Sequence, residues 1–201
     1  MSTRTSPRDT STTDPANNRA ALFEDSARGV IRAAAALAGF CEHVEHNEPT
    51  IQQLPIDAAR RLRAIAVDLA TGTELDLARS YTARIAHVER TSLHSQVPGS
   101  PIPFLPGADA MTAASTWAEF QLAQVVHDRQ FHPDVFGLSK IDQLRHYTLH
   151  VTKLAGLLID AIDSNDWPSF SPHRLSDLAI FGVKIATTCN DRLPATALTT
   201  T

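Results

Sequence analysis

The sequence lacks several features that would assign it to a familiar class. It has only two cysteines, Cys41 and Cys189, far apart in the chain, which excludes a disulfide-rich scaffold and favours reduced thiols in a cytoplasmic protein. No apolar run approaches the roughly 20 residues of a membrane-spanning helix, and the N-terminus lacks the apolar region of a secretory signal. We therefore expect no membrane partner.

Basic excess and nucleotide motifs are missing as well. The net charge is −4 and the pI is near 6.1, which argues against a nucleic-acid partner. The chain contains no P-loop, GxGxxG, GxSxG or CxxC motif. The sequence therefore gives no sign of the common nucleotide-binding loops or of a redox-active dithiol.

The chain of 201 residues is long enough for one good core. Residues 1–19, rich in Ser, Thr, Asp, Asn and Pro, are predicted to be a disordered tail. An N-terminal helical segment (20–95) and a C-terminal helical segment (111–193) flank a loop at 96–110 that holds four prolines and two glycines, and 194–201 is expected to be a tail.

Apolar periodicity predicts an all-α bundle of about six helices, with no strand of consequence. The helices are expected to begin near residues 20, 55, 74, 111, 140 and 172. Thr73 is the predicted cap of the third helix, and Ser139 with Asp142 forms a predicted capping box for the fifth. The predicted core positions include Ile31 and Val44 in the first helix, and Leu122 and Val126 in the fourth.

The stretch from His127 to Asp160 concentrates the polar chemistry, because it holds four of the nine histidines. Asp142, His146 and His150 lie at i, i+4 and i+8 and share one helical face with Lys153. Leu149 and Leu157 lie on the same side. A solvated face rarely needs two leucines, so this face is expected to be partly covered by the sixth helix or by a partner.

Histidines at i and i+4 are a recurrent metal-ligand spacing, because both imidazoles reach one point above the helix. The candidate ligands of a divalent metal are His146, His150, His127 and His132, with Asp128 and Asp134 nearby. Hydrogen bonds at helix ends, a polar interface, phosphate binding and proton transfer remain open as other uses of these histidines.

The dipeptide His127-Asp128 also resembles that of HD-type phosphohydrolases. The resemblance implies a metal site completed by an upstream histidine and a downstream aspartate. His87 or His94, with Asp163 or Asp177, could supply them.

Residues 117–193 resemble the MazG-like all-α nucleotide pyrophosphohydrolases. The matching segments are WAEFQ (117–121), QFHP (130–133), KLAGLLIDAI (153–162) and LSDLAIFGVKIA (175–186). In that family acidic residues of the third and fourth segments hold Mg²⁺, which bridges a triphosphate and activates water. Asp160 and Asp177 remain here, together with Gly156. Other acidic positions of the family motif are replaced, and these replacements are Lys153, Leu154, Leu157 and Arg174. The resemblance implies a retained helical frame with a degenerate metal motif.

A looser resemblance is to DinB-like four-helix metalloproteins, which carry one histidine on an early helix and an HxxxH pair on a late one. His87 with His146 and His150 would match that arrangement. The segment Val151-Thr152-Lys153 departs from the glycine-glutamine segment that usually follows the pair.

These observations lead to three hypotheses. The first is a cytosolic binding or accessory protein that recognises a phosphorylated small molecule or a protein partner. Its expected ligand-binding residues are Lys153, Arg145, His146, His150, Asp160 and Asp177. The second is a metal-dependent enzyme, a phosphohydrolase or a DinB-like transferase, that uses histidines around His146 and His150. The third is an interaction module that forms a homo-oligomer, such as a homodimer, through the face of Leu149 and Leu157.

Overall fold

The structure, a computed structural model, describes residues 15–45, 53–93, 114–166, 170 and 172–198. These residues form an all-α multi-helix bundle, which confirms the predicted fold class. Among them the one β-type pairing is an isolated bridge between Thr116 and Ala197. The helices are α1 (Pro15–Glu45), α2 (Gln53–Gly72), α3 (Leu77–Leu93), α5 (Trp117–Phe131), α6 (Pro133–Phe136), α7 (Lys140–Asp163) and α8 (Pro172–Thr188).

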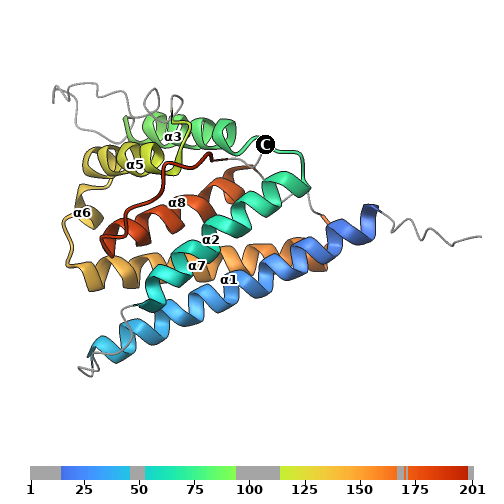
Figure 1. Cartoon of the computed structure of the whole chain (residues 1–201), viewed down its shortest axis with the longest axis horizontal. Helices are drawn as coiled ribbons and strands as arrows, with labels where there is room; N and C mark the ends of the chain where they lie inside the picture. Colours follow the sequence, from blue (N-terminus) through green and yellow to red (C-terminus); the bar gives the residue numbers. More distant parts are fainter. Residues whose placement is uncertain (1–14, 46–52, 94–113, 167–169, 171, 199–201) are drawn as a thin grey trace, which may run out of the picture.

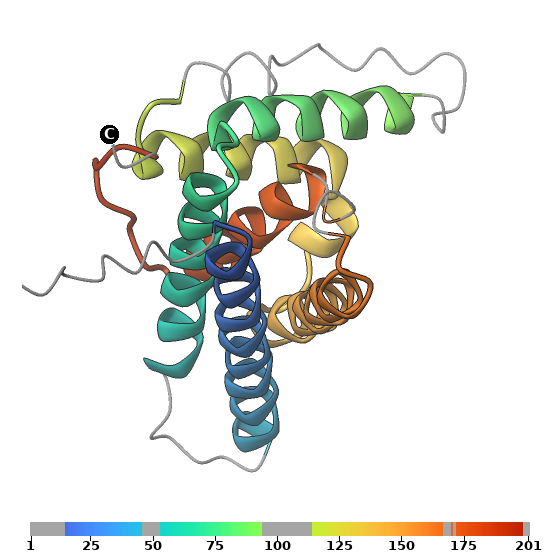
Figure 2. The same ribbon diagram turned by 90° about the vertical axis from the view of Figure 1, so that its right-hand side faces the viewer.

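Helix α8 is the centre of the bundle and contacts α2, α3, α5 and α7. The long helix α1 packs against α2 and α7 along one side, whereas α3 and α5 lie together on the other (Figure 1). Figure 2 shows α3 and α5 running across the direction of α1. Helices from both sides of residues 96–110 contribute to one hydrophobic core. The two predicted helical segments therefore share their packing.

Close backbone approach fixes α8 against α2. A Cβ atom added to Gly182 would lie 2.9 Å from the Ala59 carbonyl oxygen and 2.7 Å from Cγ of Arg63. Such separations are shorter than real Cβ contacts, so glycine is required for this crossing. The crossing places the far side of α8 toward α3, α5 and α7.

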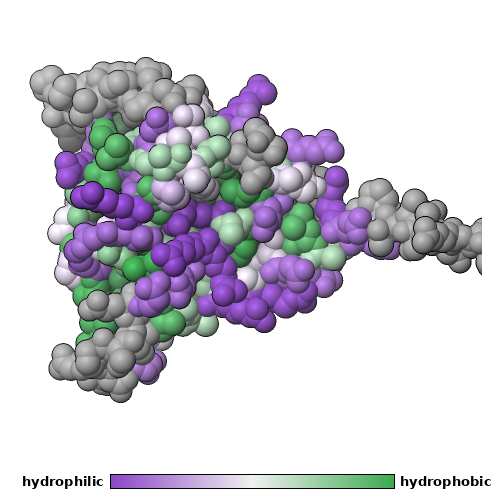
Figure 3. Space-filling model, in the orientation of Figure 1, coloured by the Kyte–Doolittle hydropathy of each residue, from purple (hydrophilic) through white to green (hydrophobic). Residues whose placement is uncertain are grey.

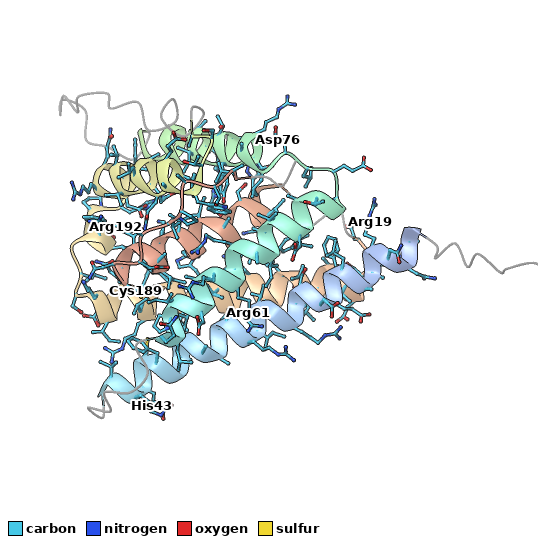
Figure 4. The ribbon with its side chains drawn as sticks, viewed as in Figure 1. Arg19, His43, Arg61, Asp76, Cys189 and Arg192 are labelled. Carbon is cyan, nitrogen blue, oxygen red and sulfur yellow. The ribbon has the colours of Figure 1, made fainter. Side chains whose placement is uncertain are left out.

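Two predicted helix starts near the N-terminus are corrected. Helix α1 begins at Pro15 rather than Ala20, because proline with its fixed φ is well suited to the first helical turn. The predicted cap Thr73 instead donates its hydroxyl to the Leu69 carbonyl at 2.6 Å. Asp76, labelled at the start of α3 in Figure 4, caps that helix by accepting the Arg79 N–H at 3.0 Å. The predicted disorder of residues 1–14 lies outside the described residues.

The fourth expected helix also begins later than predicted, at Trp117 rather than near residue 111. A capping box fixes this helix start, since the Thr116 hydroxyl accepts the Glu119 N–H and the Glu119 carboxylate accepts the Thr116 N–H. Hydrogen bonds to the Glu119 carboxylate, first from Ser115 and then from Thr116, lower the pKa of Glu119. Ser139 does cap α7 as predicted, because its side chain accepts the Asp142 N–H. The predicted capping box is not completed, since the Asp142 carboxylate accepts the Ser139 hydroxyl. The predicted loop at 96–110 lies outside the described residues.

The described part of the predicted C-terminal tail is packed rather than free. Its backbone pairs with the start of α5, where Trp117 N–H donates to the Thr196 carbonyl and Ala118 N–H donates to the Pro194 carbonyl, each at 3.1 Å. Leu198 is 3% exposed. Helix N-termini leave N–H groups without intrahelical partners, and this extended segment satisfies them.

Some predicted core positions are exposed. Leu122 is 69% exposed, Ile31 45%, and Val44 and Val126 39% each. They lie beside the apolar stripe rather than on it, and periodicity locates a stripe more reliably than its edges. Figure 3 shows hydrophilic and hydrophobic residues interspersed on one face of the molecule. No described helix is both long and apolar enough to cross a membrane.

Candidate functional site

A cavity of about 400 Å³ opens among α3, α5, α6, α7 and α8. Its size falls within the usual range for small-molecule pockets. It gathers six of the predicted site residues from three parts of the chain. They are His127, His132, His146, His150, Lys153 and Asp177. Side chains that are separate in the sequence thus line one space, which we call the central cavity.

Two predicted ligand-binding residues are not among those that line the central cavity. Arg145 forms an ion pair with Asp142 at 3.1 Å on its own helix, and both side chains are partly exposed. Asp160 is exposed near the end of α7. A helix turns by about 100° per residue, so residues close in sequence to His146 or Lys153 need not share their face.

We call the group His127, Asp128, His132 and Lys184 the floor of the central cavity. His127, His132 and Lys184 line the cavity, and Asp128 contacts Lys184. His127 is 1% exposed and Asp128 6%. The Asp128 carboxylate accepts hydrogen bonds from Lys184 Nζ and from Gln124 Nε2, each at 2.8 Å. Lys184 Nζ also lies 5.9 Å from the ring centroids of Tyr147 and Phe181. The buried charges of the floor are therefore paired.

Burial keeps the floor histidines neutral. Desolvation, with smaller effects of His132, Lys184 and Arg84, lowers the pKa of His127 from about 6.5 to about 3. Desolvation first, and then Lys184, also lowers the pKa of His132. Burial therefore favours the neutral form of both imidazoles, and a neutral ring can accept a hydrogen bond or bind a metal.

The α7 wall, formed by His146, His150 and Lys153, is more open. The Nε2 atoms of His146 and His150 are 3.2 Å apart. The His150 ring stacks on Phe181 of α8, with centroids 4.8 Å apart and an interplanar angle of 20°. Desolvation, followed by the charge of His146, lowers the pKa of His150. Helix α8 therefore covers part of this face, as predicted for the sixth helix.

The two leucines of the same face behave differently from the prediction. Leu149 is 72% exposed, whereas Leu157 packs partly against the core. They lie eight residues apart on α7. The part of the wall near Leu149 is therefore uncovered in the described structure.

Four cationic side chains line the central cavity against two carboxylates: Arg84, Lys153, Arg174 and Lys184 against Asp134 and Asp177. Arg84 Nε donates to Asp177 at 2.8 Å, with the aspartate side chain 11% exposed. Asp177 is thus paired with an arginine of α3. Counting Asp128 of the floor as well, the local formal charge is 4 − 3 = +1 with neutral histidines.

Sequence reasoning missed Arg84 and Lys184. Lys184 had a usable signal, because it is the one charge within the apolar run LAIFGVKIA of α8. A lone charge in a buried helix needs a partner. Arg84 had no such signal, since α3 carries several arginines and only the packing of α3 on α8 brings this one to Asp177.

The extra ligands suggested by the HD-type and DinB-like resemblances are dispersed among the described residues. His87 lies in a separate surface depression near His173, with ring centroids 6.0 Å apart. Asp163 is exposed at the end of α7, and Asp177 is engaged by Arg84. His94 lies outside the described residues. The cluster around His127 and Asp128 is instead completed by His132, with one ligand atom from each residue within 4.8 Å of the others.

No family model, no curated protein and no solved structure matches the chain. The MazG-like and DinB-like resemblances therefore stay predictions that rest on the residues quoted for them.

Proposed function

We propose that the protein is a helical binding or accessory protein that takes a small phosphorylated molecule in the central cavity. The supporting observation is the set of four cationic side chains that line a cavity of about 400 Å³. A phosphate group accepts several charge-assisted hydrogen bonds, and arginine and lysine are its usual donors. A degenerate MazG-like frame and a cytoplasmic location belong to the same proposal.

The cations have different parts in this proposal. Arg84 and Lys184 are held in place by Asp177 and Asp128. Lys153 is exposed on α7, and Arg174 lies at the start of α8. For these two, no carboxylate partner is found within the described residues. They are the side chains able to engage an incoming phosphate without first breaking an ion pair.

Pyrophosphate-induced thermal stabilisation tests the proposal, measured with a chelator present. A ligand at about 100 times its Kd stabilises the folded state by about 2.7 kcal/mol. We expect Lys153→Ala and His150→Ala to abolish the shift in Tm. Arg145→Ala is the matched control, since Arg145 is on the same helix but outside the cavity. Unchanged shifts in both cavity variants would contradict the proposal.

A metal-dependent enzyme, a phosphohydrolase or a DinB-like transferase, is the second candidate. The separation of 3.2 Å between Nε2 of His146 and Nε2 of His150 favours it. Two nitrogens that bind one zinc ion at about 2.0–2.1 Å in a tetrahedron stand at a similar separation. This candidate predicts stoichiometric metal in untagged protein that is lost in His146→Ala or His150→Ala.

A protein partner or a second copy of the chain is the remaining candidate for the exposed part of α7. The single supporting observation is the exposure of Leu149, at 72%. Light scattering at several concentrations measures self-association directly, with Leu149→Ser as the variant.

A further inference from the structure

We propose that His127, Asp128 and His132 form a binding site for a divalent transition metal at the floor of the central cavity, distinct from the histidine pair on α7. Among the described residues they are the one group of three or more histidine, cysteine or acidic side chains with ligand atoms within 4.8 Å of one another. The proposal does not depend on phosphate binding, and its probe is the metal alone.

The end of α5 brings these three side chains together. His127 and Asp128 lie in its last turn, and His132 is its C-cap residue with φ −133° and ψ 47°. This backbone leaves the helical path, while the His132 N–H still donates to the Asp128 carbonyl at 2.9 Å. The rings of His127 and His132 consequently lie edge to face, with centroids 5.5 Å apart at an angle of 64°.

Two neutral imidazoles and one carboxylate are a donor set that suits zinc and the neighbouring first-row metals. Both histidines line the central cavity, so a coordination position left by the protein would face that space. Such an arrangement, with three protein ligands and an open position, is typical of catalytic rather than structural metal sites.

The residues that contact the proposed ligands also fit a metal site. Metal-bound carboxylates are usually held by further hydrogen bonds, and Asp128 receives one from Gln124. Gln124 is 2% exposed and lines the cavity, and its Oε1 atom has no hydrogen-bond partner among the described residues. An amide oxygen in that position can accept a hydrogen bond from a metal-bound water.

Lys184 opposes the metal, because its ammonium group lies 2.8 Å from Asp128 Oδ1. A metal at this site must share the carboxylate with that cation or displace it. The affinity of the site for a metal is therefore lower than its three ligands alone would give. Removing the lysine charge should tighten metal binding, whereas it should weaken the binding of any anion.

Cobalt(II) titration of the untagged full chain, followed by absorption and calorimetry, tests the site. We expect one equivalent of cobalt to bind. His132→Ala and Asp128→Asn each remove a proposed ligand, so they should weaken binding by at least ~100-fold, which is the upper end of the effect of losing a residue that only supports a ligand. His173→Ala, which alters a histidine of the separate surface depression, is the matched control and should change the affinity by less than about twofold. Circular dichroism checks that each variant is folded.

A second arm uses Lys184→Gln, with Lys184→Met as the alternative if the first variant is unfolded. Either should bind cobalt about tenfold more tightly than the natural protein, because the competing charge is gone. Absence of binding, or binding lost in His146→Ala and kept in His132→Ala, would overturn the proposal. Neither outcome bears on phosphate binding, which is measured with metal chelated.

Discussion

The floor of the central cavity and its α7 wall each contain two histidines and one lysine, but these side chains are held differently. On the floor, Lys184 is paired with Asp128 beneath the surface, and its side chain is 11% exposed. On the wall, Lys153 is exposed. The difference shows that burial obliges a charge to find a partner, whereas solvent leaves it free to meet a ligand.

The helices that carry the two lysines, α8 and α7, also differ in how closely they are packed. Helix α8 is surrounded by α2, α3, α5 and α7, and Gly182 admits no Cβ. Helix α7 has Gly156, where an added Cβ would meet nothing within 4 Å. The helix that carries Lys184 is therefore tightly packed at Gly182, whereas the helix that carries Lys153 has open space beside Gly156.

The largest expected effect separates the two lysines. Lys184→Met leaves Asp128 buried without its cation, so we expect the free energy of unfolding to fall by about 3 kcal/mol. Lys153→Met should change it by less than about 0.5 kcal/mol, because the side chain is exposed. Urea denaturation followed by circular dichroism measures both. Equal effects would remove the distinction between floor and wall.

The glycine pair tests the packing of the two helices. Gly182→Ala places a methyl group against the Ala59 carbonyl and should destabilise the protein by about 1–3 kcal/mol. Gly156→Ala should stabilise it by about 0.5–1 kcal/mol, because alanine is the better helix former and the space is open. Thermal melts of the two single variants check the opposite signs. A neutral Gly182→Ala would show that α2 and α8 can move apart.

Acid titration separates the histidines of the two regions in protein freed of metal. The pKa of His127 is about 3 when folded and about 6.5 when unfolded. Between these values the unfolded chain binds the extra proton, so stability is full above pH ~6.5 and is lost progressively as the pH falls toward 3. The slope reaches about 1.4 kcal/mol per pH unit for one such group.

His127→Gln should flatten that slope between pH 6.5 and the acid limit of folding. His150→Gln should flatten it less, because the His150 ring is only half-buried while its pKa is lowered in the same direction. Chemical denaturation repeated at several pH values measures the slope. An unaltered slope in His127→Gln would mean that folding does not lower the pKa of His127.

Much of the scaffold could be predicted from the sequence, because its signals are local. The apolar stripe of α2 and the Ser139 cap of α7 follow from residues within a turn of one another. Helix ends with less direct signals were misplaced, as at Pro15 and Thr116. The start of α1 is set by a proline and the start of α5 by a capping box, and both lie in or near segments that we predicted to be a tail or a loop.

The sequence by itself determined that the chain is helical and that histidines gather between residues 127 and 150, since periodicity and composition are properties of the chain alone. Tertiary structure decided which side chains meet. Arg84 reaches Asp177, Lys184 reaches Asp128, and His150 stacks on Phe181 only because α3, α5 and α7 all pack on α8. A contact between helices depends on their crossing and rotation, which are set by the packing of the whole core.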